Sequence, residues 1–267
     1  MRNSSAALDA LAAKLWLWAA AGALTGLLLA LVLFAPARWL AALLKQASAE
    51  QLVLAAPRGS FWQGSAQLVL AGGAGSRDAL ALPGEFSWRI RPSWHGLTLQ
   101  LKADCCMQQA LQLSASPLGW GGIQLALADS QSQWPAGLLI GLGTPWNTIQ
   151  AQGQLLASTQ GLNVQWAKGQ LSLAGQVQLD AQQISSRLST LRPMGSYRLT
   201  LQGGPSSTLE LSTLEGRLQL SGQGQWVGQR LRFEGTARAT PESVDALSNL
   251  LNIIGRRQGA TATIKVG

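Results

Sequence analysis

The side chains that could carry out catalysis are few and scattered along this chain. It contains one histidine, His95, and two cysteines, Cys105 and Cys106, which are adjacent. Acid–base and nucleophilic catalysis need a nucleophile, a base and an orienting group within hydrogen-bond reach. A zinc site needs three or four nitrogen, sulfur or oxygen ligands. The sequence therefore predicts no enzyme, no catalytic residue, no metal site and no cofactor, and we interpret His95 as a turn residue.

The adjacent cysteines leave two interpretations open. In an oxidising compartment Cys105 and Cys106 could form a vicinal disulfide, or each could pair with a second molecule. On a β-strand, consecutive side chains point to opposite faces, which makes a bond between neighbours awkward. Two ordinary strand cysteines are the default interpretation, and a disulfide between them is the alternative.

An uncharged apolar run near the N-terminus is expected to position everything that follows. Residues 15–34 contain no charged side chain, and a helix of this length covers roughly 30 Å, the thickness of the hydrocarbon core of a bilayer. Trp16 and Trp18 lie near one end and Trp39 just past the other, where membrane interfaces favour aromatic rings. The run predicts a membrane span. The alternatives are a buried core helix and a cleaved signal peptide, whose apolar core is usually shorter.

The expected organisation of the chain follows from this span. Residues 1–14 are predicted to be a cytoplasmic tail, 15–34 a transmembrane helix, 35–50 a juxtamembrane linker or helix extension, and 51–267 an exported β domain. Charge bias around the span helps only weakly, but a short tail is the easier part to leave in the cytoplasm. The predicted orientation has the N-terminus inside and the bulk of the protein outside.

From residue 51 onward, leucine alternates with polar residues in short runs. Examples are AQLVL at 66–70, LTLQL at 97–101 and RLQL at 217–220. Such runs recur with turns of Gly, Pro, Asp and Ser between them, which predicts about 14 to 16 strands. Alternation of this kind indicates strands that bury one face and expose the other, as antiparallel sheets do.

Few helices are expected among these strands. Residues 135–142 could form a short apolar helix or a loop plug. Residues 241–254 are predicted to form an amphipathic helix, with Thr240 as N-cap, Pro241 at the first helical position and Gly255 past the end. The predicted fold is mainly β: a single N-terminal transmembrane helix, then a large, curved, mostly antiparallel sheet, U-shaped or barrel-like, with one late amphipathic helix.

The net charge of +8, from 20 Lys and Arg against 12 Asp and Glu, does not indicate a nucleic-acid partner. The basic residues are scattered and form no stripe along a helix. Tryptophan is unusually frequent, with 11 residues against one tyrosine and four phenylalanines. Four of these rings are interpreted as strand residues buried against the sheet, namely Trp62, Trp88, Trp166 and Trp226, and an aromatic surface for a partner or a glycan is the alternative.

Several short motifs follow one another in a distinctive order along the chain. We interpret their residues as structural; they are Gly59, Trp62, Gly64, Trp88, Pro92, Trp166, Gly195, Tyr197, Gly216, Gly222, Trp226 and Gly235. The order of these motifs resembles protein N of the bacterial type II secretion system, the general secretion pathway protein N family. The resemblance covers most of the chain, and the Cys105–Cys106 pair has no place in it.

This resemblance implies a non-enzymatic accessory component of the type II protein secretion machinery. It would be a single-pass protein of the bacterial inner membrane, with a cytoplasmic N-terminus and its β domain in the periplasm. The expected partners are other inner-membrane and periplasmic subunits of the apparatus, which the β domain would scaffold, with contacts that could form by strand addition at exposed sheet edges.

A second hypothesis belongs to a different class of protein. A curved sheet with one apolar face also suits a membrane-anchored periplasmic protein that binds or transfers lipid in an apolar groove. That version expects a continuous groove lined by Leu99, Leu101, Leu125, Leu127, Leu199 and Leu201. The scaffold version expects those leucines to pack against one another or against a second sheet. A glycan-binding wall anchor ranks third.

Overall fold

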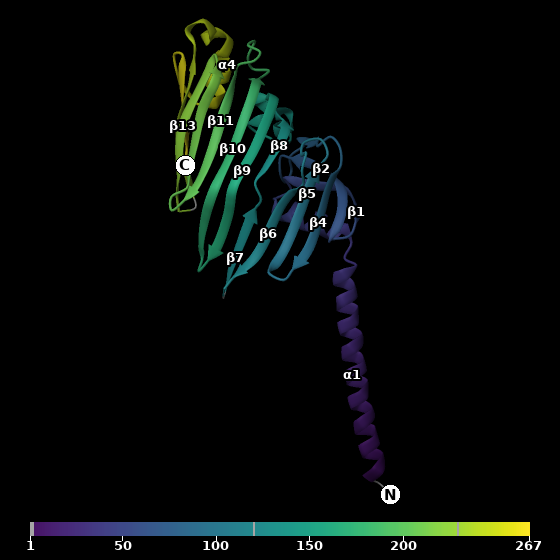
Figure 1. Cartoon of the computed structure of the whole chain (residues 1–267). Helices are drawn as coiled ribbons and strands as arrows, with labels where there is room; N and C mark the ends of the chain where they lie inside the picture. The colour runs from purple at the N-terminus through teal and green to yellow at the C-terminus, as the bar shows by residue number, and fades with distance from the viewer. Residues whose placement is uncertain (1–2, 120, 229) are drawn as a thin grey trace.

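The computed structural model describes residues 3–119, 121–228 and 230–267, and a single large sheet dominates it (Figure 1). The helical elements are α1 (Asn3–Leu33), α2 (Ala37–Ala47), the 3-10 helix η1 (Ala136–Leu142), α3 (Trp146–Ile149), the 3-10 helix η2 (Pro241–Ser243) and α4 (Val244–Ile254). The strands are β1 (Leu52–Gly59), β2 (Gln63–Ala71), β3 (Ala79–Ala81), β4 (Phe86–Ser93), β5 (Gly96–Ala103), β6 (Leu111–Leu118), β7 (Gly122–Leu127), β8 (Ser130–Pro135), β9 (Gln152–Ala167), β10 (Gln170–Ser185), β11 (Gly195–Gly204), β12 (Thr208–Gly216), β13 (Leu218–Val227), β14 (Arg230–Ala239), β15 (Arg256–Gln258) and β16 (Thr261–Val266).

The 16 strands form one antiparallel sheet that does not close. Its order is β1-β2-β4-β5-β6-β7-β9-β10-β11-β12-β13-β14-β16-β15, with β3 paired to β2 and β8 paired to β9. The prediction of a mainly β fold with a large antiparallel sheet is confirmed. The barrel-like form of that prediction is wrong, because β1 and β15 lie at opposite ends of the strand order and do not pair with each other.

The alternation of leucine with polar residues gives the sheet one apolar and one polar face. Residues that pair across neighbouring strands lie on the same face. Leu99 pairs with Leu113, which pairs with Leu127. In the second half of the sheet, Leu179 pairs with Leu199. We call this leucine-rich surface the apolar face and the opposite surface, rich in Gln, Ser and Thr, the polar face.

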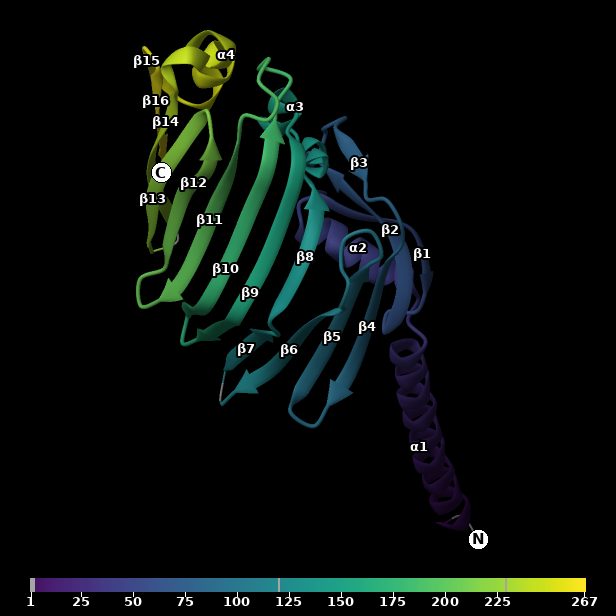
Figure 2. The same cartoon turned by 45° about the horizontal axis from the view of Figure 1, so that its top comes forward.

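The helices that follow α1 lie against the apolar face. One core cluster, formed beside α2, contains Ala37, Leu54, Ala66 and Trp88. The largest cluster joins Leu247, Leu250 and Leu251 of α4 to buried residues of β9, β11, β13, β14 and β16. In Figures 1 and 2 both ends of the strand order turn toward the side of the sheet that carries α2.

The antiparallel order places six hairpin turns of the sheet at one end. The turns that join β1 to β2, β4 to β5, β6 to β7, β9 to β10, β11 to β12 and β13 to β14 all lie there; we call it the turn end. Most of the buried core lies toward the opposite end, where η1, α3 and α4 pack. That opposite end, the helix end, is where the connections from β10 to β11 and from β12 to β13 run.

The end of α1 is fixed to the turn end by hydrogen bonds. The indole Nε1 of Trp62 donates to the carbonyl oxygen of Val32 at 2.8 Å. The backbone N–H of Phe61 donates to the carbonyl oxygen of Ala35 at 2.7 Å. Pro36 forms an isolated antiparallel bridge with Ser60. The β1–β2 turn is therefore hydrogen-bonded to the chain at the end of α1 and just after it. From there α1 extends away from the turn end (Figure 2).

The N-terminal helix includes the residues for which a membrane span is expected. From Trp18 to Phe34 every side chain is exposed. A search of the described residues finds no helix whose length and hydropathy qualify it to cross a membrane. The transmembrane part of the predicted fold is not confirmed.

The late helix forms where its sequence signals place it, but its α-helical part begins at Val244, and the Thr240 side chain makes no capping hydrogen bond to the backbone among the described residues. Thr240 precedes it, Pro241 lies in its first turn as part of η2, and Gly255 follows Ile254, the last residue of α4. The first turn has 3-10 geometry, and the Thr240 hydroxyl donates a 3.1 Å hydrogen bond to the hydroxyl oxygen of Ser243. The apolar stripe of α4 covers the helix end of the sheet, so the prediction of one late amphipathic helix is confirmed.

The Tyr197 side chain allows a direct test of the helix-end core. Tyr197 is 6% exposed, and its hydroxyl oxygen has no hydrogen-bond partner among the described residues. Burial also raises the pKa of this phenol well above its usual range. We expect Tyr197→Phe to raise the free energy of unfolding by about 1 kcal/mol, because it removes an unpaired buried polar group.

The matched variant Tyr197→Ala should instead lower the free energy of unfolding by about 3–5 kcal/mol through the cavity it leaves. Thermal unfolding of the full chain in detergent, followed by tryptophan fluorescence, measures both variants. A Tyr197→Phe variant that melts below the wild type would contradict the packing described for this hydroxyl.

Candidate functional site

The residues that carry the family resemblance gather in local clusters. The first cluster lies at the α1 junction and contains Gly59, Trp62, Gly64 and Trp88. Gly59 has a φ of 88°, which favours glycine, and pairs with Gly64 across the turn. The Trp88 ring packs over Gly64, where a Cβ would collide with it. These residues shape the turn that holds the end of α1.

The second cluster lies at the helix end. Gly195 pairs with Gly216 across β11 and β12, and the Tyr197 ring lies over Gly195. The absence of a side chain at Gly195 makes room for that ring. Gly216 also has a positive φ of 130°. This cluster supports the core under α4.

The third cluster lies on β13 and β14. Gly222 pairs with Gly235, and the ring of Phe233 covers both, so that a Cβ on either glycine would meet it. The other three residues of the motif set, Pro92, Trp166 and Trp226, lie near three different turns and are not brought together. No point in the fold collects the motif set into one site.

The side chains that could act as nucleophiles, bases or metal ligands also lie apart in the fold. His95 lies exposed in the β4–β5 turn. Cys105 and Cys106 lie in the turn after β5, and their sulfur atoms are bonded to each other. Because the pair lies in a turn and not on a strand, the alternation of side chains does not oppose the bond. Within the described ranges, no three His, Cys, Asp or Glu side chains are grouped as metal ligands would be.

The feature that stands out is a strip of the apolar face without a covering layer. Its side chains are half-buried, pair with apolar residues across strands, and belong to none of the three core clusters found in the described residues. We call this the open strip; it consists of Leu113, Leu125, Leu127, Val164, Leu199, Leu201 and Leu209.

The open strip exists because the helices are too few and too short to span the sheet. Their principal contacts are with β1, β2 and β3, with β9, and with β14, β15 and β16. The middle strands are left to expose apolar side chains between these contacts. Of the six leucines expected to line a groove, Leu99 and Leu101 pack beside α2, whereas Leu125, Leu127, Leu199 and Leu201 lie in the open strip.

The sheet edges are poorly suited to strand addition. β15 has three residues, of which Arg256 and Arg257 are basic. β1 contains Pro57, which has no backbone N–H, and Ala56 with a φ of 47°. Short strands, charges, proline and irregular backbone are the features that blunt sheet edges. The open strip is therefore a better candidate contact surface than either edge.

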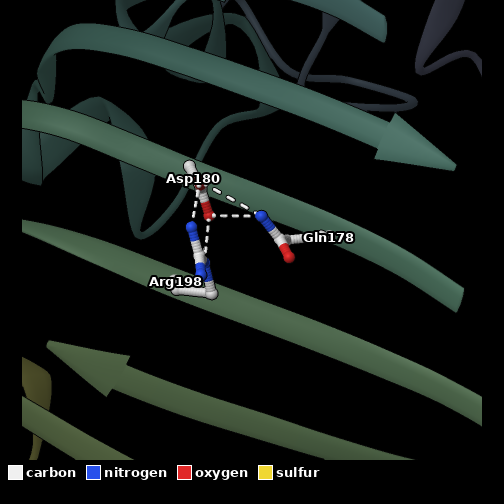
Figure 3. A network of polar contacts seen from close by, with 3 residues as sticks. All are labelled: Gln178, Asp180 and Arg198. Carbon is white, nitrogen blue, oxygen red and sulfur yellow. Dashed lines mark hydrogen bonds and ion pairs between the residues drawn. The ribbon is translucent and has the colours of Figure 1, made fainter. Parts of the chain in front are cut away.

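On the polar face, one ion pair joins β10 to β11 (Figure 3). The guanidinium of Arg198 donates from Nε to Oδ1 of Asp180 and from Nη2 to Oδ2, both at 2.7 Å. The amide of Gln178 donates to the same carboxylate at 3.2 Å. Hydrogen bonding by Arg198, aided by its charge and by Gln178, outweighs burial and lowers the pKa of the Asp180 carboxyl. Asp180 and Arg198 are directly opposite each other on β10 and β11, so the ion pair links the two strands.

The fold and the open strip define a class of protein: an antiparallel β protein whose large open sheet, in the described residues, leaves part of its apolar face uncovered. The family model for protein N of the type II secretion system (T2SS) matches residues 50–264. The chain belongs to this family, and the resemblance seen in the motifs is confirmed. The family is a component of secretion machinery and not a known enzyme, which supports an accessory role in type II secretion.

A search of curated proteins finds no match, and a search of solved structures finds none either.

Several features of the site have only weak signals in the sequence. The alternation predicts the leucines of the open strip, but not that helices leave them uncovered. The hydrogen bond from Trp62 to Val32 has no signal in the local sequence, because the two residues are 30 positions apart. The Asp180–Arg198 pair could be suspected only after the register of β10 and β11 is known.

The Asp180–Arg198 pair predicts a pH-dependent contribution to stability. At neutral pH, Asp180→Asn should lower the free energy of unfolding by about 1 kcal/mol, a value reduced for the partial exposure of Arg198. Because the pKa of the carboxyl is lower in the folded state, this stability is fully present above the ordinary aspartate pKa of 3.8 and is lost as the pH falls through the folded-state pKa.

Melting temperatures of the wild type and the variant, measured between neutral and acid pH, should therefore converge below pH 3.8. Glu210→Gln, an exposed carboxyl on the same face, is the matched control and should leave the melting temperature nearly unchanged at neutral pH. A constant gap between wild type and Asp180→Asn at all pH values would contradict the assignment.

Proposed function

We propose that this chain is a non-enzymatic accessory subunit of the type II secretion machinery that holds another subunit on the open strip. In this proposal α1 anchors the protein in the bacterial inner membrane, with the N-terminus in the cytoplasm and the sheet in the periplasm. The observation that carries the proposal is the apolar strip that no helix or second sheet covers in the described residues.

The exposed surface of α1 supports the anchor. Residues 15–34 lack charged side chains, and within them Trp18 is 77% exposed and Phe34 is 81% exposed. Apolar side chains that are exposed on all sides of a helix are unfavourable in water. A bilayer would cover them, and the hydrogen bonds from Trp62 and Phe61 would then hold the sheet at the membrane surface.

The bonded cysteines support a periplasmic sheet. Disulfides persist in oxidising compartments such as the bacterial periplasm and are rare in the cytosol. Cys105 and Cys106 lie in the sheet domain and are joined in the structure. A cytoplasmic location would leave this bond open to reduction.

The chemistry of the open strip supports a protein partner. Its members are aliphatic, and charged residues are also depleted from the centres of protein interfaces. The strip runs across several strands, from β6 to β12, and so could receive an apolar helix face or a hairpin from another subunit. The sheet edges, by contrast, are blunted by short strands, proline and arginine.

Lipid binding in the open strip is a second candidate, and the same observation favours it. The scaffold hypothesis expects the six leucines to pack against one another or against a second sheet. They do pair across strands, but the described residues form one sheet, with no second sheet to pack against. Four of these leucines lie in the open strip, as a lipid groove would require. What occupies the strip therefore decides between the two candidates.

Site-specific photo-crosslinking in cells tests this occupancy. A photoreactive amino acid in place of Leu201 should capture another secretion subunit. The same amino acid in place of Gln202, the neighbouring residue on the polar face, is the matched control and should capture much less. Adducts with lipid alone at position 201 would favour the second candidate. Equal yields at the two positions would refute both.

A functional variant provides an independent measurement. The double substitution Leu199→Gln and Leu201→Gln should reduce type II secretion while the chain still accumulates, because it makes the open strip polar without changing a core cluster. Thr200→Ala with Gln202→Ala, on the polar face, is the control. Secretion that remains normal in the leucine variant would contradict the proposed role of the strip.

A further inference from the structure

The turn end of the sheet exposes large apolar side chains. Trp94 in the β4–β5 turn is 101% exposed, and Ile123 beside the β6–β7 turn is 50% exposed. Trp166 and Leu171, on either side of the β9–β10 turn, are 51% and 71% exposed. Apolar side chains of this size are usually buried. Their repetition on neighbouring turns indicates a surface that contacts something apolar.

The same turns carry positive charge and no negative charge. Arg58, Arg91, Lys168 and Arg230 lie in or next to them. The sequence contains neither Asp nor Glu at 57–65, 91–98, 117–123, 165–172, 203–209 or 225–232, which are the segments around the six turns. Acidic residues such as Asp78, Glu85, Asp104 and Glu242 lie near the other end of the strands. The turn end is therefore apolar and basic.

The turn end also faces in the direction taken by α1. In the β1–β2 turn, Trp62 donates to the carbonyl oxygen of Val32 in the last turn of α1, and Phe61 donates to that of Ala35 just after α1. The antiparallel order places the β4–β5, β6–β7 and β9–β10 turns at this same end. In both views these hairpins point to the side of the sheet from which α1 extends (Figures 1 and 2).

We propose that the β4–β5, β6–β7 and β9–β10 turns form a second contact with the membrane, at the headgroup layer of anionic phospholipid. Trp94 and Trp166 would lie at the interface, which favours tryptophan. Arg91 and Lys168 would bind phosphate groups, which attract basic side chains close to a membrane surface. The inference rests on the proposed anchor, because α1 would bring these turns to the bilayer.

A lipid surface fits these turns better than an acidic protein. Trp94 lies at the tip of the β4–β5 hairpin, whereas Ile123, Trp166 and Leu171 are adjacent across β7, β9 and β10, so the apolar side chains are spread along the end of the sheet. A flat, fluid surface can accept the hairpin tip and the adjacent row at once. A folded partner would need a matched shape for each of them.

The test uses the full chain reconstituted in vesicles of phosphatidylethanolamine and phosphatidylglycerol. A photoreactive amino acid replaces, one at a time, Trp94, Trp166, Leu28 of α1, or Trp146 of α3, which is 38% exposed toward the helix end and serves as control. Mass spectrometry then detects lipid adducts. We expect adducts at positions 94, 166 and 28, and none above background at 146.

The outcomes separate this inference from the anchor. Adducts at 28 without adducts at 94 and 166 would overturn the second contact and leave the anchor standing. Adducts at 94 and 166 without adducts at 28 would support the contact of the turns with lipid and would refute the proposal that α1 is a membrane anchor. Adducts between two copies of the chain at 94, in place of lipid, would also overturn the inference.

A charge variant tests the headgroup contact. Arg91→Gln with Lys168→Gln should reduce the lipid adduct at position 94 several-fold in these vesicles and leave the adduct at 28 unchanged. An unchanged yield at 94 would overturn the role of anionic phosphate.

Discussion

The structure depends on one constraint: in the described part of the chain, the strands form a single layer with one apolar face and no second sheet. Most of the long strands alternate apolar with polar residues, so each of them adds apolar surface on the same side. In a barrel or sandwich that surface would be covered by the sheet itself. Here α2, η1, α3 and α4 cover it, and they reach only part of it. The open strip is the part of the apolar face that these helices leave uncovered, and the proposed function rests on it.

The two ends of the sheet have different structural roles: the helix end holds most of the buried core, and the turn end holds α1. At the helix end, Leu247 and Leu251 are fully buried, and Gly195 under the Tyr197 ring allows close packing. At the turn end, hydrogen bonds from Trp62 and Phe61 fix the chain that leaves α1. Rigidity at one end and attachment at the other would hold the open strip at a defined height above a membrane, as a subunit that positions others must.

Local sequence signals predicted what depends on local physics. The alternation in LTLQL predicted the strand that becomes β5, and Thr240, Pro241 and Gly255 predicted the bounds of the late helix within a turn. Choices that depend on distant residues were not predictable. Nothing near Leu125 or Leu199 shows that no second sheet covers them, and strand alternation suggested a strand at Cys105, where the chain turns instead. The blunted edge at β15 appears only once the strand order is known.

The most direct test of this account is side-chain footprinting of the protein in living cells by hydroxyl radicals. It would compare cells that contain the other secretion subunits with cells that lack them. We predict that Leu125, Leu127, Leu199 and Leu201 are labelled more strongly when the other subunits are absent, whereas exposed Trp146 at the helix end does not change. Equal labelling of these leucines in both kinds of cell would show that no secretion subunit covers the open strip, and would contradict the account.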